Sequence, residues 1–367
     1  MTDPPPVIAR SRRGRATLST IAASAGVSVA TVSKVLNGRA DVAPGTRALV
    51  QELLVRHDYV GRPAKPAARI RAGTPAPGDR RPVELVFHSD LNAYGIEVVQ
   101  GVIEAGATAG VSVVVTRRPD HGAASARGTQ WVADLVSGDR QAVISAMDDK
   151  LTVEDVDALT RASLPLVVID PLNLPDASIT SIGSTNFSGG LTATRHLLSL
   201  GHRRIAYVGG PVTAACNQAR VHGYRAAMEA AGAPILDEYV RTGDFLYENG
   251  LRLGRELLAL PEPPTACFAG SDETALGVIE AARSLGLRVP EDLSVIGFDD
   301  TQMAQLSSPP LTTIRQPLRE MGAVALRTAL RLAAGEELES HHVELATQLV
   351  QRRSTGPLRV RSEPDPT

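Results

Sequence analysis

The chain has 367 residues, of which 43% are hydrophobic, enough for two or three domains with cores of ordinary size. Its net charge of −2 is the sum of a basic N-terminal part, which we call the head, and an acidic remainder, which we call the body. Residues 1–81 hold 14 Lys or Arg against 5 Asp or Glu (+9), and the rest hold 24 against 35 (−11). This asymmetry predicts contact with nucleic acid through the head alone.

The composition also excludes several classes of protein. Two cysteines form neither a metal-binding spacing nor a disulfide framework, and no stretch approaches 18 apolar residues, so neither a disulfide scaffold nor a membrane span is expected. The start, MTDPPPVIARSRRGR, lacks the apolar run of a signal peptide. We therefore expect a cytoplasmic protein, and no cofactor or metal.

Residues 17–37, TLSTIAASAGVSVATVSKVLN, predict two short helices joined by a tight turn. Thr17 is a candidate N-cap of the first helix, which Gly26 ends, and Ser28 is a candidate N-cap of the second, Val29 to Leu36. A helix, a turn with glycine and a second helix make a helix-turn-helix, whose second helix can lie in the DNA major groove. The alternative is an ordinary helical hairpin, which the basic charge and the helix that follows disfavour.

A third helix is predicted over residues 44–57, PGTRALVQELLVRH, with a buried stripe of Leu49, Val50, Leu53 and Leu54. The stretch that follows is rich in proline and arginine, which argues against a packed core. We therefore divide the head into a basic arm (1–16), a helix-turn-helix domain (17–60) and a linker (61–81).

From residue 82 an α/β pattern repeats. Strand-like apolar runs occupy residues 83–89, 111–116, 141–146, 165–170, 204–210, 265–270 and 293–298, and helices such as 96–109, 187–200 and 219–231 lie between them. Buried strands alternating with helices predict parallel sheets with helices on both faces. Because the pattern restarts near residue 186, we expect two similar subdomains with a cleft between them, where ligands bind at the carboxyl ends of strands.

Taken together, these segments resemble regulators of the lactose-repressor/galactose-repressor (LacI/GalR) family. The resemblance covers roughly residues 16–355 and rests on ATLSTIAASAGVSVATVSKVLNG and RHDYV in the head, and on LLSLGHRRIAYVGGP, ARVHGYRAAMEAAG, FAGSDETALGVIEAARSLGLRVPEDLSVIGFDD and SPPLTTIRQP in the body. It implies a three-helix head that binds operator DNA as a dimer. It also implies an α/β body resembling periplasmic sugar-binding proteins, in which an effector, often a sugar, changes the relation of the subdomains and thereby operator affinity.

The resemblance further implies that the chain crosses between the subdomains three times, so that TTIRQP returns to the first. The body then spans residues 82–360. Its first subdomain comprises about residues 82–184 and 315–340, and its second comprises about residues 185–314 and 341–360.

By motif, the resemblance directs Val29, Ala30 and Lys34 toward base edges. Lys34 can donate to guanine O6 and N7, whereas Val29 and Ala30 offer only apolar contact, for example with a thymine methyl. The other expected DNA contacts, to phosphates or nearby bases, are Thr17, Ser28, Thr31, Ser33 and Asn37. For Thr31 and Ser33 we favour simple phosphate positioning.

The linker departs from the family pattern. Such repressors usually fold a short hinge helix there and insert a Leu into the minor groove. Here Ala68 holds that position and Pro66 lies inside the expected helix, where a proline costs about 3 kcal/mol. Either a hinge helix begins at Pro66, or the linker stays extended and Arg69 and Arg71 enter a narrow minor groove.

In the body, the resemblance marks Arg220 of ARVHGY as the principal effector contact, because its planar fork can grip vicinal hydroxyls or a carboxylate. The alternative is a structural salt bridge that closes the subdomains. Asp299, at a strand end, is expected to accept from ligand hydroxyls opposite Arg220. Asp272 is expected to cap the helix that follows it, which leaves Ser271 as the ligand contact of that loop.

Further effector contacts are expected at strand ends and in the neighbouring loops: Ser89, Asp90, Asn92, Tyr94, Asp170, Cys216, Phe245 and Gln316. Asp170 faces the cleft from the first subdomain, and Phe245 can stack on an apolar sugar face. Opposed Asp and Arg side chains above an aromatic floor suit a neutral polyol, since each hydroxyl both donates and accepts. A purine would need more aromatic stacking than a 3% aromatic content readily offers.

Two other functions compete with a DNA-binding regulator. An enzyme is disfavoured because no GxGxxG or GxxxxGK[ST] motif opens a helix and Cys216 has no His partner nearby in sequence. A pure ligand carrier fits the body but leaves the helix-turn-helix unexplained. The sequence thus predicts a non-enzymatic repressor, homodimeric, whose partners are operator DNA and a mono- or oligosaccharide, with no membrane involved.

Overall fold

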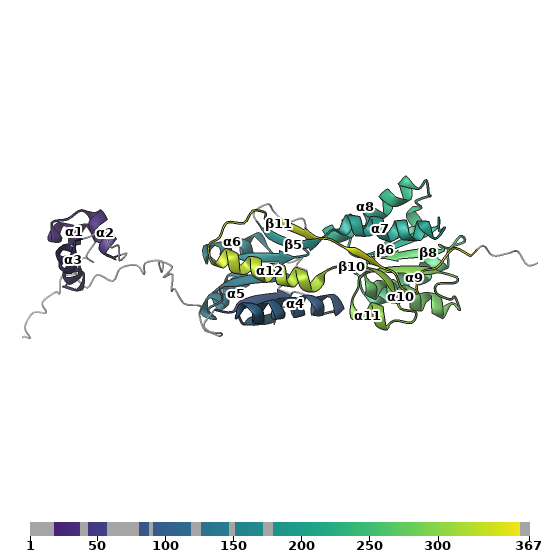
Figure 1. Ribbon diagram of the computed structural model, residues 1–367, viewed down its shortest axis with the longest axis horizontal. Coiled ribbons are helices and arrows are strands. Elements are labelled where there is room, and N and C mark those ends of the chain that lie inside the picture. Colours follow the sequence, from purple (N-terminus) through teal and green to yellow (C-terminus); the bar gives the residue numbers. More distant parts are fainter. Residues whose placement is uncertain are drawn as a thin grey trace, which may run out of the picture. The chain divides into compact units, whose positions relative to one another are not determined.

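The computed structural model describes residues 18–36, 43–56, 81–87, 91–118, 126–146, 151–171 and 179–359 (Figure 1). It divides into two units, Met1–Thr74 and Pro75–Thr367, so the division falls within the predicted linker. Among the described helices, none has the length and apolar content needed to cross a bilayer.

The described part of the first unit is helical: α1 (Leu18–Ala25), α2 (Val29–Leu36) and α3 (Pro44–Arg56). Gly26 follows α1 with a φ of +64°, the left-handed conformation that glycine adopts without strain. The Ser28 hydroxyl accepts a 3.1 Å hydrogen bond from the backbone N–H of Thr31 and so caps α2, as predicted.

A small apolar core joins the three helices, made by Ala22, Val32, Val35, Val50 and Leu53. Leu49, predicted in the buried stripe of α3, is 44% exposed. Among the described side chains of α3, Val50 and Leu53 reach this core and Leu49 does not.

The second unit consists of two lobes, each built on a six-stranded sheet. The first sheet is parallel throughout, in the order β11-β5-β4-β3-β1-β2. Its strands are β1 (Val83–Phe87), β2 (Val113–Arg117), β3 (Ala142–Ala146), β4 (Leu166–Ile169), β5 (Thr180–Ser184) and β11 (His342–Leu345).

The second sheet has the order β12-β10-β9-β8-β6-β7 and is parallel except for β12, which runs antiparallel to β10. Its strands are β6 (Ile205–Gly209), β7 (Val240–Thr242), β8 (Ala266–Ala269), β9 (Ser294–Asp299), β10 (Thr312–Arg315) and β12 (Gln348–Val350). The central strands of both sheets are fully buried, as their uninterrupted apolar runs predicted.

Helices cover both sheets. The first lobe has α4 (Ala93–Ala109), α5 (Ala126–Ser137), α6 (Val153–Arg161) and α12 (Leu318–Ala333). The second has α7 (Asn186–Ser199), α8 (Ala215–Ala230), the short 3-10 turn η1 (Asp237–Tyr239), α9 (Tyr247–Leu258), α10 (Asp272–Ser284) and α11 (Gln302–Leu306). Helices α4 and α12 lie side by side (Figure 1), and they approach closely because a Cβ on Gly101 would collide with the backbone carbonyl of Arg319.

The chain crosses between the lobes three times, from β5 to α7, from β10 to α12, and from β11 to β12. The prediction that TTIRQP leads back to the first lobe is confirmed. The assignment of every residue from 341 onward to the second subdomain is wrong, because β11 pairs with β5 in the first sheet. The run HVEL alternates half-buried and exposed residues, so it lacks the continuous burial of recognised strands such as β3 and β8.

Candidate functional site

The exposed face of α2 is the candidate DNA interface. Val29 is 44% exposed and Lys34 is also exposed, whereas Val32 and Val35 lie in the core. The Thr31 hydroxyl pairs with Ser28 Oγ at 2.9 Å. Val29 and Lys34 are therefore presented to solvent as base reading requires, while the two hydroxyls are engaged at the start of the helix.

Several predicted contacts lie outside the described residues, namely Thr17, Asn37, Arg69, Ser89 and Asp90. The side chains of Ala30 and Ser33 lie outside them as well. The linker around Pro66 also lies outside the described residues, so the hinge helix and the extended linker both stay predictions.

The body brings five of the predicted effector residues together, and we call them the interlobe cluster: Tyr94, Asp170, Arg220, Asp299 and Gln316. Asp170 follows β4 of the first lobe and Asp299 ends β9 of the second, and each is 6% exposed. Burial raises the pKa of both carboxyls, and the charge of Arg220 opposes that rise in each. Charged groups from both lobes thus act on one another in a buried setting, which is the arrangement predicted for an effector site.

Arg220 is fixed in place by its own protein. It lies in the second turn of α8, which begins four residues earlier than predicted. Its Nε donates to Asn186 Oδ1 at 2.8 Å and its Nη1 donates to the Gly270 carbonyl at 2.5 Å. The guanidinium carbon lies 3.8 Å from the centre of the Phe298 ring and 5.3 Å from that of Phe245.

These bonds use two of the five N–H groups of the guanidinium, and among the described residues it forms no ion pair. The alternative of a salt bridge that closes the subdomains is therefore not what the described residues show. A pre-oriented guanidinium with three further donors is suited to binding hydroxyl or carboxylate oxygens.

Asp170 is held from the first lobe by Tyr94, whose hydroxyl donates to Asp170 Oδ2 at 2.8 Å. Burial, and then the charge of Asp170, raises the pKa of Tyr94 well above 10, so the phenol remains a donor. Asn92 was predicted to contact the effector, but its side chain accepts from the Gly95 N–H at 3.0 Å and caps α4.

In the loop after β8, the predicted helix cap is wrong. Ser271, not Asp272, is the N-cap of α10, with its Oγ accepting from the Thr274 N–H at 3.0 Å. Ser271 has the extended backbone that an N-cap requires, and its hydroxyl also donates to the Phe245 carbonyl at 2.6 Å.

Asp272 is instead fully buried and joins three segments of the second lobe. Its Oδ2 accepts from the Thr301 N–H and hydroxyl, and its Oδ1 accepts from the Thr313 hydroxyl at 2.6 Å. Burial raises the pKa of Asp272 to about 7. Asp272 thus anchors the turn that follows Asp299, and it does not cap α10 as predicted.

Left-handed backbone conformations gather at the same strand ends. The φ angles are +47° at Asp170, +67° at Phe245, +118° at Asp299 and +59° at Asp300. Such conformations cost of order 1–3 kcal/mol each in non-glycine residues and are found where function fixes a side chain. Phe245 is half-buried, and its ring lies so close to Gly210 that a Cβ there would collide with it.

Cys216 lies at the start of α8 and is 7% exposed. Burial raises the pKa of its thiol to about 11, so it is protonated at neutral pH. Among the described residues, no cluster of His, Cys, Asp and Glu is arranged to hold a metal ion.

Sequence reasoning missed Ser184, Asn186 and Phe298. Ser184 ends β5 and Asn186 opens α7 directly after it. The run TSIGS is too polar to have been recognised as a strand. Had it been, the rule that ligands bind at the carboxyl ends of parallel strands would have drawn attention to both residues.

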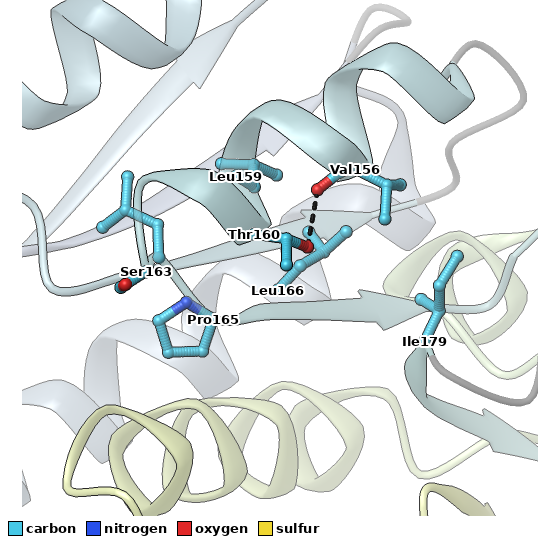
Figure 2. Close-up of a pocket in the computed structure, with 8 residues that line it drawn as sticks. Val156, Leu159, Thr160, Ser163, Pro165, Leu166 and Ile179 are labelled. Carbon is cyan, nitrogen blue, oxygen red and sulfur yellow. Dashed lines mark hydrogen bonds between the residues drawn. The ribbon is translucent and has the colours of Figure 1, made fainter.

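A separate cavity of about 300 Å³ lies in the first lobe beside α6 (Figure 2), lined by Val156, Leu159, Thr160, Ser163, Leu164, Pro165, Leu166 and Ile179. The hydrogen bond within it runs from the Thr160 hydroxyl to the Val156 carbonyl, inside α6. The lining has no charged group and includes none of the predicted effector residues.

Comparisons with known proteins agree with the two-unit division. A family described as bacterial regulatory proteins, lacI family, matches residues 17–61, and a periplasmic binding protein-like domain matches residues 194–355. The HTH-type transcriptional regulator CelR of Thermobifida fusca is 33% identical over 360 residues, which cover 94% of this chain and 99% of that protein.

Two solved structures are similar over nearly the whole chain. A transcriptional regulator CelR–cellobiose complex has a TM-score of 0.67 and 31% identity, covering 93% of this chain and all of that one. The lac repressor dimer bound to operator and the anti-inducer ONPF has a TM-score of 0.64 and 27% identity, covering 93% of this chain and 99% of that one.

Proposed function

Because this chain belongs to the lacI family of bacterial regulatory proteins, we propose that it is a homodimeric repressor whose operator affinity is set by a sugar bound between its lobes. Its three-helix head presents Val29 and Lys34 to the major groove. Its body holds the sugar at the interlobe cluster. As a protein that binds operator DNA, it would act in the cytoplasm.

The observation that carries the sugar assignment is the meeting of buried Asp170 and Tyr94 from one lobe with Arg220 and Asp299 from the other. A sugar hydroxyl can donate to a carboxylate while accepting from the guanidinium. The half-buried ring of Phe245 offers an apolar face to a pyranose. One relative of known structure, the CelR complex, holds cellobiose, so cellobiose is the first sugar to test.

The same geometry explains how a sugar would alter DNA binding. A ligand that contacts both lobes favours one lobe arrangement by its differential affinity for that arrangement. Coupling free energies of this kind are typically about 1–3 kcal/mol, which corresponds to a change in operator affinity of about 5- to 150-fold.

We infer that the body binds its ligand without transforming it. Cys216 is the one nucleophile that the sequence offered in this region, and burial keeps its thiol protonated. Asp170 and Asp299 are engaged by Tyr94 and Gln316 respectively, which suits binding.

The full chain should be tested by fluorescence anisotropy against DNA from upstream of its own gene, with and without cellobiose. We expect specific binding whose dissociation constant changes at least fivefold with cellobiose, while the recovered sugar is chemically unchanged. A response to some other mono- or oligosaccharide would keep the class and correct the sugar. Failure to bind the DNA, or no response to any sugar of a broad panel, would contradict the proposal.

A further inference from the structure

A continuous chain of hydrogen bonds links Arg220 to Asp299 by way of the segments that cross between the lobes. Arg220 Nε donates to Asn186 Oδ1 at 2.8 Å, and Asn186 Nδ2 donates to the Ser184 carbonyl at 3.1 Å. The Ser184 hydroxyl donates to Gln316 Oε1 at 2.5 Å, and Gln316 Nε2 donates to Asp299 Oδ1 at 2.6 Å. We call these four bonds the Ser184 relay.

The direction of each bond at Gln316 follows from chemistry. The amide nitrogen of Gln316 only donates, and it faces Asp299 Oδ1, which accepts. The amide oxygen then faces Ser184, whose hydroxyl must donate. Ser184 is 1% exposed and Gln316 is 3% exposed, so water competes little for these bonds.

The relay lies where the two lobes are joined. Ser184 is the last residue of β5 in the first sheet, and Gln316 follows β10 of the second sheet. The third crossing is tied to the first in the same way, because the Thr347 N–H donates to Thr185 Oγ1 at 3.0 Å. These are the segments about which the angle between the lobes can change, so a bond between Ser184 and Gln316 can help to hold one lobe arrangement.

We propose that Ser184 is a positioning residue whose hydroxyl holds the lobes in the arrangement that buries Asp170 and Asp299 together. The hydroxyl acts through Gln316, which orients Asp299. The backbone carbonyl of Ser184 holds Asn186, which orients Arg220. The proposal rests on the proposed function only for the identity of the ligand, since every bond of the relay is made between residues of the chain.

The test compares two serines of the same strand. Ser184→Ala removes the relay hydroxyl, whereas Ser181→Ala removes a hydroxyl that bonds His342 Nδ1 at 3.0 Å, away from the relay. Nitroxide labels are attached at Glu154→Cys on α6 and Glu229→Cys on α8, two exposed positions on different lobes of the full chain. Burial raises the thiol pKa of Cys216 to about 11 and of Cys267 to about 12, so both react slowly at neutral pH.

Interlobe distances are measured by double electron–electron resonance without ligand, with labelled chains diluted in unlabelled protein. We expect Ser184→Ala to broaden the distance distribution and shift it by several ångströms, and Ser181→Ala to match the parent. Ser184→Thr keeps the hydroxyl and should restore the parent distribution. Gln316→Met breaks the same bond by removing the amide of Gln316, and it should reproduce the shift. This second variant keeps the test decisive if Ser184→Ala folds poorly. Parent-like distributions in the variants without the bond would overturn the proposal.

A second arm adds cellobiose to the same samples. If the parent does not bind cellobiose but loss of the hydroxyl still shifts the lobes, the relay stands and the sugar assignment fails. If cellobiose binds but the variants keep the parent distribution, the sugar assignment stands and the relay fails.

Discussion

The guanidinium of Arg220 rests on the ring of Phe298, one residue before Asp299 on β9. One strand therefore supplies both the platform that fixes the arginine and the carboxylate that we propose to share its ligand. This stacking and the bond to Asn186 orient the arginine before a ligand arrives, which reduces the entropy lost on binding.

Arg220→Ala should abolish the effector response while leaving ligand-free operator affinity within about threefold. Loss of a charge-assisted contact from a buried site should weaken sugar binding by about 10- to 100-fold. The fold should also lose about 1–3 kcal/mol, since Asn186 Oδ1 and the Gly270 carbonyl lose their donor. Calorimetry with the cognate sugar and thermal melting measure the two effects. A lowered melting temperature with unchanged sugar affinity would show that the arginine is only structural.

Lys34→Ala should weaken operator binding by about 1–3 kcal/mol and relax the preference at one symmetric base position. Arg12→Ala, in the basic arm, serves as the control and should weaken all sequences alike and flatten the salt dependence. Anisotropy titrations against single-base operator variants distinguish the two. Uniform weakening by Lys34→Ala would assign this lysine to phosphate contact.

Val50→Ala should unfold the head selectively. Val50 is fully buried in a core of five side chains, so the loss of two methyl groups should cost about 1–3 kcal/mol. Leu49→Ala, at a 44% exposed neighbour, is the matched control and should change little. Calorimetry should show the head transition moving and the body transition unchanged. Equal effects of the two substitutions would mean that α3 packs differently.

The sequence predicted those features that depend on local pattern. Uninterrupted apolar runs marked the central strands, and caps with a turn glycine marked the helices of the head. The polar strands β5 and β11 were not predicted, because their own composition does not favour a strand. They are strands because they pair with neighbouring strands of the sheet.

At the candidate site, strand ends located Asp170 and Asp299, and the family motif located Arg220. The Ser184 relay escaped because Ser184 and Gln316 lie 132 positions apart in sequence. The structural role of Asp272 was missed for a similar reason, since its partners, Thr301 and Thr313, come from later segments.

The body should dimerise without the head. Ile96 and Ile103 lie seven residues apart on α4, so they share a helix face, and each is 48% exposed. Deleting residues 1–81 should abolish DNA binding and leave a dimer in sedimentation velocity, because the body has its own cores. Ile103→Asp should convert that dimer to monomer. A monomeric body before any substitution would assign dimerisation to the head.

The last prediction concerns His202, which is 3% exposed in the second lobe. Its Nε2 lies 3.0 Å from the Gly356 carbonyl, which only accepts, so Nε2 carries the proton and Nδ1 accepts from the Thr265 hydroxyl at 3.0 Å. The neutral ring is thus fully hydrogen-bonded. Burial lowers the pKa of His202, and the bond to Gly356 only partly opposes this.

Between the folded pKa and the ordinary value of about 6.5, the unfolded chain binds a proton that the folded chain does not. The stability contributed by neutral His202 is therefore fully present above pH 6.5 and is lost as the pH falls below it. Burial also lowers the pKa of His196, which acts in the same direction. The raised pKa values of Asp170, Asp272 and Asp299 act in the opposite direction, so the test compares variants of the body. On going from pH 7.5 to pH 5.5, the melting temperature of His202→Gln should shift upward relative to that of the parent. The exposed His222→Gln should follow the parent, and equal slopes in the two variants would place the pH dependence elsewhere.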